Sequence, residues 1–276
     1  MFKVALIGAS GLLGRAVAEE LTRQLSWTVV QTAFRRAGPD RISLDIRDED
    51  AVFAFFEVEK PDAVVLTAAE RRPDVCENDP EFARALNVDA VRIIASAAEK
   101  YGAWTLSIST DYVFDGTSPP YHTDAAPSPI NAYGRSKLDG ERALAQASAN
   151  SCVLRLPLLY GPTDDWSESA VTSLIPAILA SVSAENADAV MDAWAIRYPT
   201  YTPDVAVVIR QMLERHRSGE AICGMAHWSA DEPMTKFDIA RVIAKAFGVS
   251  ARLTPQYVPT DSTPRPHDCH LGSERL

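Results

Sequence analysis

Three spaced glycines follow a short apolar run almost at the start of the sequence. Val4–Ile7 are apolar, Gly8, Gly11 and Gly14 come next, and apolar residues at helical spacing continue to Leu21. The pattern predicts a strand, a tight turn and a helix whose N-terminal N–H groups can meet a pyrophosphate. A turn with a purely structural role is the alternative, because spaced glycines alone are a weak signal.

The end of the next predicted strand bears on which nucleotide would bind. Residues 27–33 are rich in β-branched side chains, and Phe34, Arg35 and Arg36 follow them. In folds that bind NAD, an acidic residue near this place accepts the 2′-hydroxyl of the ribose. Two guanidinium groups favour a 2′-phosphate instead, which indicates NADP(H). The alternative is that both arginines are solvated surface residues.

Composition excludes several classes of protein. The chain has 276 residues, 47% of them hydrophobic, and a net charge of −10, which is typical of a globular protein and argues against a nucleic-acid partner. No stretch has the features of a signal peptide or the length of a membrane span, so we expect a cytoplasmic protein. Scattered cysteines without a CxxC pair indicate reduced thiols. They are Cys76, Cys152, Cys223 and Cys269.

Strand and helix patterns alternate along the chain and predict an α/β fold. Further strands are expected near 41–45, 62–67, 104–108 and 151–155, helices near 48–59, 79–100, 133–147 and 236–247, and another helix that begins at 202–206. We predict a Rossmann-type, doubly wound parallel sheet in residues 1–160, completed by about 189–216. Residues 161–188 and 217–276 would form a smaller C-terminal lobe. Asn87, within the long helix, is either a core amide or part of a proton relay.

Candidate catalytic groups come after the strand at 104–108. Ser109 and Thr110 place hydroxyls at its carboxyl end, where open α/β sheets bind ligands. Tyr133 and Lys137 are four residues apart and so share one helix face. An adjacent ammonium would stabilise the Tyr133 phenolate and lower the phenol pKa toward the range of a general acid. A tyrosine and a lysine at this spacing on a surface are the alternative.

A small group of possible metal ligands lies near the end of the sequence. His267, Cys269 and His270 are close together in a polar segment. Such tight spacing without a second ligand pair is more typical of exposed side chains, so no metal site is expected.

Two longer motifs carry a resemblance to a known family. Ser109–Gly116 (STDYVFDG) and Pro129–Leu138 (PINAYGRSKL) resemble the extended short-chain dehydrogenase/reductase family, and within it the dTDP-4-dehydrorhamnose reductases. Five segments are also similar to the regulatory β subunits of methionine adenosyltransferase. They are Ala68–Val75, Asp111–Tyr121, Glu168–Thr172, Met191–Thr200 and His227–Lys236.

The resemblance implies an NADP(H) site and a reductase site beside it. Thr110 would hydrogen-bond the carbonyl oxygen of a substrate, Tyr133 would give it a proton, and Lys137 would tune Tyr133 and hold the ribose. The cofactor residues implied are Gly8, Ser10, Gly11, Leu12, Leu13, Gly14, Phe34, Arg35, Arg36, Asp45, Ile46, Thr67, Ala68, Ala69, Arg71, Tyr133, Lys137 and Leu159. Relatives continue beyond the equivalent of Arg265-Pro266 into a closing helix, whereas this sequence ends at Leu276, so contacts from such a helix are not part of the expectation.

The resemblance leaves two functions open. One is the reduction of the 4-keto group of a nucleotide-linked deoxysugar. The other is a regulatory subunit that binds a methionine adenosyltransferase catalytic subunit and keeps its NADP(H) site as structure. Apolar residues at 168–175 and 191–198, among them Ile175, Met191, Trp194 and Tyr198, would line a substrate pocket or face that partner. A homodimer is compatible with either function.

Overall fold

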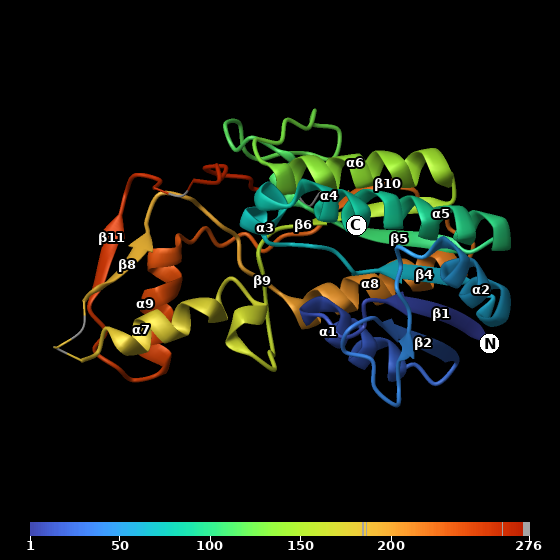
Figure 1. Ribbon diagram of the computed structural model, residues 1–276, viewed down its shortest axis with the longest axis horizontal. Helices are drawn as coiled ribbons and strands as arrows, with labels where there is room; N and C mark the ends of the chain where they lie inside the picture. Colours follow the sequence, from blue (N-terminus) through green and yellow to red (C-terminus); the bar gives the residue numbers. More distant parts are fainter. Residues whose placement is uncertain (184, 186, 261, 273–276) are drawn as a thin grey trace.

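A parallel sheet of seven strands forms the centre of the protein (Figure 1). The computed structural model describes residues 1–183, 185, 187–260 and 262–272. The strands are β1 (Phe2–Ile7), β2 (Trp27–Ala33), β3 (Ile42–Ser43), β4 (Ala63–Leu66), β5 (Trp104–Thr110), β6 (Ser151–Leu156) and β10 (Gly224–His227). Their order is β10-β6-β5-β4-β1-β2-β3, and every neighbouring pair is parallel. The order reverses between β1 and β4, and in such sheets ligands bind outside the carboxyl ends of the strands at that point.

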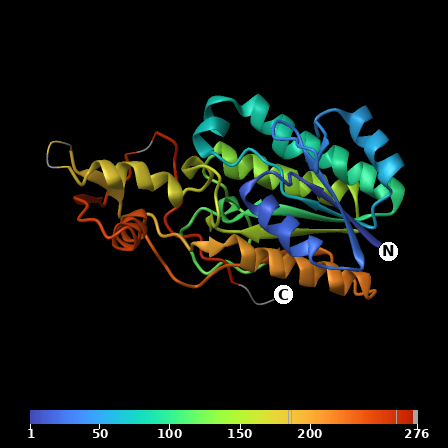
Figure 2. The same cartoon turned by 90° about the horizontal axis from the view of Figure 1, so that it is seen from below.

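Helices cover both faces of the sheet, as Figure 2 shows. One face carries α1 (Leu12–Thr22) and α8 (Thr202–Arg217), and the other carries α2 (Glu49–Glu59), α5 (Ala90–Tyr101) and α6 (Ala132–Ala147). Val17 and Ile209 join the first layer to Leu6 of β1, while Phe56 and Ile94 join the second to Val64 of β4. All of these side chains are fully buried. The doubly wound Rossmann-type sheet predicted from the sequence is therefore confirmed.

A smaller group of elements lies beside the carboxyl ends of the strands (Figure 1). It contains α7 (Ile175–Ala180), α9 (Lys236–Ala246) and a two-stranded parallel sheet of β8 (Ala189–Asp192) and β11 (Leu253–Gln256). A second short pair, β7 (Leu159–Tyr160) and β9 (Thr200–Tyr201), lies where the chain passes between the two groups. The side chain of Thr235 caps α9 by accepting from Asp238 N at 3.1 Å.

Several apolar residues considered for a pocket or a partner surface are core residues instead. Ile175, Met191 and Tyr198 are all less than 7% exposed. Met191 packs in one cluster with Ile178 and Ala240. The small lobe has enough helix and sheet to bury these side chains, so they offer no surface to another protein.

Two strands lie on the opposite side of the expected lobe division. β8, within the stretch expected to complete the large sheet, pairs with β11 in the small lobe. β10, within the stretch expected to belong to the small lobe, pairs with β6 at the edge of the large sheet. β10 is only four residues long and begins with a glycine, so its sequence contains no strand pattern that would have revealed this placement.

The helix predicted near 79–100 is interrupted. α3 (Pro73–Asn78) and α4 (Pro80–Arg84) precede a π-helical segment at Ala85–Asp89, and only then does α5 begin. Prolines stand at the first positions of α3 and α4, which suits their missing N–H. A π segment widens the helical turn and changes the direction of its side chains, so that one of them can reach a partner that it could not reach from a regular α-helix.

Asn87 uses this widened turn. Its side chain accepts a hydrogen bond from Glu70 N at 2.9 Å and donates to Glu70 O at 2.9 Å and to Ser136 Oγ at 3.0 Å. The residue is fully buried. Of the two alternatives, the structure favours a core amide whose bonding capacity is taken up by these partners.

The possible metal ligands near the end of the chain face different partners. His267 lies against Trp194, His270 stacks on Tyr198, and Cys269 is buried with its thiol 3.6 Å from Phe114 O. Among the described residues, no three histidines, cysteines or carboxylates gather where they could hold a metal ion.

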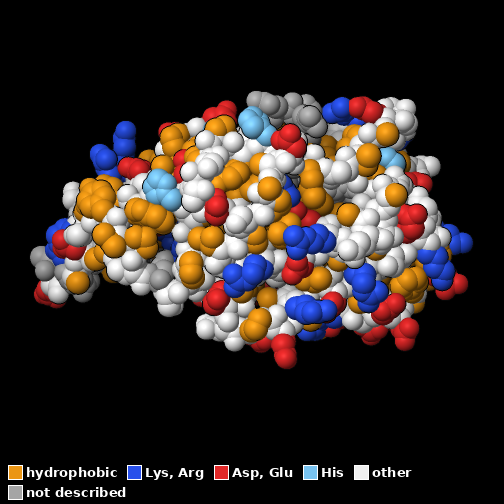
Figure 3. All heavy atoms as spheres, turned by 90° about the horizontal axis from the view of Figure 1, so that it is seen from above, with side chains coloured by type: hydrophobic (Ala, Val, Ile, Leu, Met, Phe, Trp, Pro, Cys, Tyr) orange, Lys and Arg blue, Asp and Glu red, His pale blue; other side chains and the backbone are white. Residues whose placement is uncertain are grey.

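No helix in the described part of the chain is long and apolar enough to cross a membrane. On the face seen in Figure 3, basic and acidic side chains lie next to one another.

Candidate functional site

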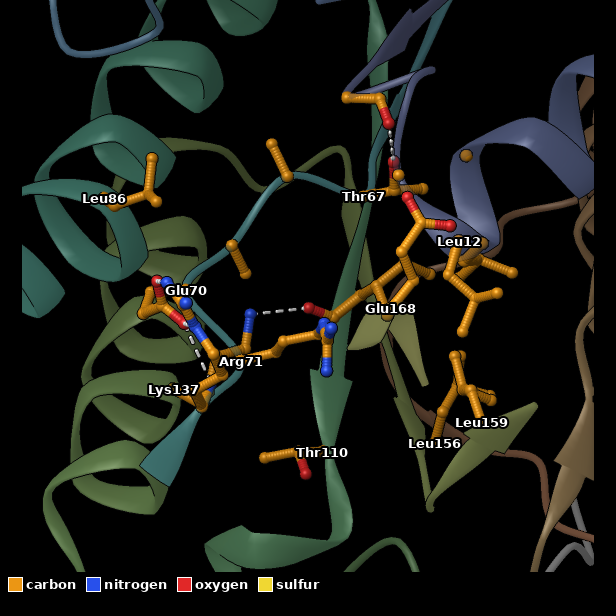
Figure 4. Close-up of a pocket in the computed structure, with 18 of the residues that line it drawn as sticks. Leu12, Thr67, Glu70, Arg71, Leu86, Thr110, Lys137, Leu156, Leu159 and Glu168 are labelled. Atoms are coloured by element: carbon orange, nitrogen blue, oxygen red, sulfur yellow. Dashed lines mark hydrogen bonds and ion pairs between the residues drawn. The ribbon is translucent and has the colours of Figure 1, made fainter. Parts of the chain in front are cut away.

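A cavity of about 710 Å³ opens at the carboxyl ends of β1, β2, β4 and β5. Every residue that the sequence assigned to the cofactor or to the chemistry lines this cavity. Figure 4 shows Leu12, Thr67, Arg71, Thr110 and Lys137 surrounding one space, although they come from four separate stretches of the chain. The fold therefore brings the predicted site together, and the role of each residue stays a prediction.

The turn after β1 is shaped for a close approach of backbone. Gly8 has φ of 89°, and a Cβ there would lie 2.8 Å from Ala68 N. A Cβ on Gly14 would lie 2.2 Å from Gly8 O, so α1 can pack on the turn only through a glycine. Gly11 caps α1 without a side chain, and no acidic residue occupies the first turn. The open N-terminus of α1 thus fits a pyrophosphate, as the sequence predicted.

The end of β2 brings a ring and several charges to the rim of the cavity. Phe34 is half exposed, and the Arg47 guanidinium lies 5.5 Å from its ring centre. Arg47 also holds the Asp45 carboxylate, with Nη2–Oδ2 at 2.6 Å. This hydrogen bond is the main cause of a lowered pKa at Asp45. Arg47 therefore compensates the Asp45 charge on this side of the cavity.

The Thr110 hydroxyl, the Tyr133 phenol and the Lys137 ammonium all belong to residues that line the cavity. Tyr133 and Lys137 lie one turn apart on α6, and Thr110 ends β5. Lys137 Nζ donates to Ile108 O at 2.8 Å. The Asn131 side chain caps α6 by accepting from Gly134 N at 2.8 Å, which fixes the first turn of the helix.

Burial governs the ionisation of the two groups on α6. It raises the pKa of Tyr133 above its ordinary value, opposed by the polar Thr110 side chain. It lowers the pKa of Lys137 to about 8, opposed by the charge of Glu141. The structure thus differs from the expectation that the phenol pKa is brought down, because burial of Tyr133 is the largest influence and raises it. Tyr133 is a protonated phenol at neutral pH, which suits a proton donor.

The comparison with protein families settles where the chain belongs. The family model described as the RmlD substrate binding domain matches residues 2–276. The chain belongs to the RmlD family. Among its relatives, methionine adenosyltransferase 2 subunit beta of Xenopus tropicalis is 44% identical over 276 residues, which cover 99% of this chain and 81% of that protein. A dTDP-4-dehydrorhamnose reductase of Aggregatibacter actinomycetemcomitans is 31% identical over 246 residues, covering 88% and 78%.

Solved structures agree with this placement. The RmlD-family chain is similar to a dTDP-4-dehydrorhamnose reductase from Clostridium acetobutylicum with a TM-score of 0.85 and 26% identity, covering 99% of this chain and 90% of that one. The enzyme of the same name from Bacillus anthracis, solved in complex with NADP, has a TM-score of 0.83, 26% identity and the same coverage. The resemblance to both groups of proteins is therefore confirmed.

Sequence reasoning missed two buried charged residues, Asp111 and Arg197, that line the cavity of this RmlD-family protein. Asp111 follows Thr110 directly and accepts a hydrogen bond from its hydroxyl at 3.0 Å. Burial raises the pKa of Asp111 to about 6, although the positive charge of Arg197 opposes the rise. Arg197 is 4% exposed and donates to Pro266 O at 3.1 Å. Only the acidic residue next to a predicted catalytic threonine could have signalled these two residues.

Sequence reasoning also missed the carboxylate that enters the cavity from the segment after β7. Glu168 had been quoted only as part of a resemblance, yet it lines the cavity and forms ion pairs with Arg15 and Arg36. Arg71 reaches the same segment, with Nη2 donating to Ser167 O at 3.1 Å (Figure 4). Arg15 and Arg36 lie 153 and 132 residues before Glu168 in the sequence, so no local pattern could indicate these ion pairs.

Proposed function

We propose that this chain binds NADP(H) in the cavity and reduces the 4-keto group of a nucleotide-linked 6-deoxysugar. The observation that carries the proposal is the meeting of Thr110, Tyr133 and Lys137 in the same cavity as the glycine turn. The turn after β1 fits a pyrophosphate, and Arg35 and Arg36 fit a 2′-phosphate. The reductases among its relatives and structural neighbours support this choice of substrate class.

In the proposed reaction, NADPH supplies the hydride to the carbonyl carbon. Tyr133 gives a proton to the carbonyl oxygen, for which its raised pKa keeps it ready at neutral pH. Lys137 is held by Ile108 O and faces the cavity, where an ammonium can bind a ribose hydroxyl. Leu156 and Leu159 add apolar walls that limit water beside the reacting atoms.

The geometry refines the role of Thr110. Its hydroxyl has one proton, which it donates to Asp111, while it accepts from Tyr112 N at 3.2 Å. The hydroxyl can donate to a substrate carbonyl instead when it turns away from Asp111, a change that is favoured when Asp111, with its pKa of about 6, is protonated.

The first test is the substitution Tyr133→Phe. We expect turnover of a dTDP-4-keto-6-deoxysugar, followed as NADPH oxidation, to fall by about 10²–10⁴-fold, the usual worth of a general acid. NADPH affinity by calorimetry should change little, because only a hydroxyl is removed. Full activity in the variant would take Tyr133 out of its role.

A second candidate is a regulatory subunit of methionine adenosyltransferase. The observation that favours it is the 44% identity to methionine adenosyltransferase 2 subunit beta, against 31% to the reductase named above. In this reading the NADP(H) site is structural. The Thr110, Tyr133 and Lys137 set does not separate the two candidates, since a binding subunit can keep it.

Two measurements on one preparation separate these functions. One is NADPH oxidation with the keto sugar, and the other is co-elution with the methionine adenosyltransferase of the same organism on gel filtration. Turnover without co-elution supports the reductase. Co-elution without turnover supports the regulatory subunit and would overturn the first proposal.

A further inference from the structure

The segment of residues 162–169, called the strap here, brings one carboxylate into the cavity. Glu168 accepts two hydrogen bonds from Arg15, at 2.6 and 3.2 Å, and another from Arg36 Nη1. Asp164 N donates to the same carboxylate at 3.1 Å. The Glu168 side chain is only 12% exposed. Its partial burial opposes ionisation, but the hydrogen bonds from Arg15 and Arg36 outweigh it and lower its pKa to about 2.

Backbone contacts hold the strap over the cavity independently of Glu168. Arg71 donates to Ser167 O at 3.1 Å, and Thr172 Oγ1 donates to Trp166 O at 2.7 Å. The Asp165 side chain accepts from Ser167 N at 2.8 Å and fixes the turn before Glu168. Glu168 is therefore placed at Arg36 by its neighbours, so removing its charge should leave the strap in position.

When NADP(H) binds, Arg36 would be shared between the Glu168 carboxylate and the 2′-phosphate of the dinucleotide. It is one of the two arginines that fit the 2′-phosphate of NADP(H), and Glu168 already holds it. A phosphate monoester carries about −1.5 to −2 charges at neutral pH, so it would be repelled by a carboxylate on the same guanidinium. NADH has only a hydroxyl at this place and would not disturb the pair.

We infer that Glu168 sets the dinucleotide preference of this site by competing with the 2′-phosphate for Arg36. The inference rests on the proposed binding of NADP(H) in this cavity, and does not depend on turnover. Arg35 and Arg36 alone would favour NADPH strongly over NADH. The internal carboxylate reduces that preference and leaves a site that accepts both.

The test is calorimetric binding of NADPH and of NADH to the full chain and to Glu168→Gln. We expect the variant to bind NADPH about tenfold more tightly, since a charge contact worth about 1.4 kcal/mol corresponds to that factor. The affinity of Glu168→Gln for NADH should differ by less than about twofold from that of the unaltered chain. Asp164→Asn is the matched control, because it removes the same charge from the strap at a 75% exposed side chain that contacts Arg15 but not Arg36.

The same substitution made in the Arg36→Ala variant separates competition for Arg36 from a general effect of Glu168→Gln on folding. In Arg36→Ala, the further change Glu168→Gln should leave NADPH affinity unaltered, because the contested partner is gone. Equal gains for NADPH and NADH, no gain in Glu168→Gln, or the same gain in the Arg36→Ala background would each overturn the inference. Failure of every form to bind either dinucleotide would overturn the inference and the NADP(H) site together. Binding without turnover of any keto sugar would remove only the reductase proposal.

Discussion

At the scale of single residues, Gly14 packs against the turn after β1 so closely that there is no room for a side chain. The hydrogen on Gly14 faces Gly8 O, which a Cβ would approach to 2.2 Å. Gly8 O also accepts from Gly11 N at 3.0 Å, so it cannot move aside without breaking the turn. A methyl group here must push α1 away from β1.

We therefore expect Gly14→Ala to lower both stability and dinucleotide affinity. Overpacking of this kind costs about 1–3 kcal/mol in the free energy of unfolding, which urea titration can measure. Gly38→Ala is the control, because nothing lies within 4 Å of a Cβ at Gly38 and the change should stay within about 0.5 kcal/mol. Equal stability of the two variants would show that α1 can shift without loss.

Residues near the glycine turn and the YxxxK motif could be predicted because their signals are local. Gly14 and Lys137 are examples, and both line the cavity. Glu168 and Arg197 could not, because what makes them important is a partner brought close by the fold. A lone glutamate in an irregular stretch has the same local sequence features whether it contacts water or two arginines.

At the scale of elements, a buried ion pair joins α6 to β6. Glu141 and Arg155 meet through bonds of 2.7 and 2.9 Å, with side chains 2% and 3% exposed. Ser109 of β5 donates to the same carboxylate, so three neighbouring elements share one network. The helix that carries Tyr133 and Lys137 is thus fixed against the sheet at its middle turn.

We expect Glu141→Gln to destabilise the protein by about 3–5 kcal/mol, because it leaves the Arg155 charge buried without compensation. Replacing both residues, as Glu141→Leu with Arg155→Met, should recover much of that loss, since the unpaired Arg155 charge is then removed as well. Urea unfolding of the three forms provides the comparison. A double variant no more stable than Glu141→Gln would mean that shape, rather than charge, holds α6 in place.

Elements with a clear local hydrophobic pattern were predictable, whereas β10 and the π segment were not. β2 was predicted at its observed bounds, and α2 to within a residue. β10 and the π segment at Ala85–Asp89 depend on tertiary pairing, namely with β6 and with Glu70. Local propensity cannot reveal either, because each is stabilised by a neighbour far away in the sequence.

At the scale of the whole molecule, β10 ends where the sheet meets the segment after β5. His227, its last residue, is 1% exposed, and its Nδ1 lies 3.2 Å from Tyr121 O. Its Nε2 lies 3.4 Å from Arg155 Nη1. An arginine can only donate, so the hydrogen-bond network assigns Nε2 as the acceptor and places the proton on Nδ1. A second proton would put a cation directly against Arg155.

We expect the stability of the whole protein to depend on pH through His227. Burial, followed by the charge of Arg155, lowers its pKa from 6.5 to about 4. Between these values the unfolded chain binds more protons at this residue than the folded chain. The free energy of unfolding therefore falls as the pH is lowered from 6.5 to 4, by at most about 1.4 kcal/mol per pH unit from one group.

Asp111 acts in the opposite direction, because burial raises its pKa from 3.8 to about 6, so the folded chain binds more protons there in this range. The effect of His227 must therefore be read as a difference between variants. Urea unfolding at several pH values should give a shallower loss of stability toward acid for His227→Gln than for the unaltered protein, whatever the offset between them. The exposed His267→Gln controls for the substitution itself. Parallel curves for His227→Gln and the unaltered protein would show that His227 takes up its proton equally in the folded and unfolded chain.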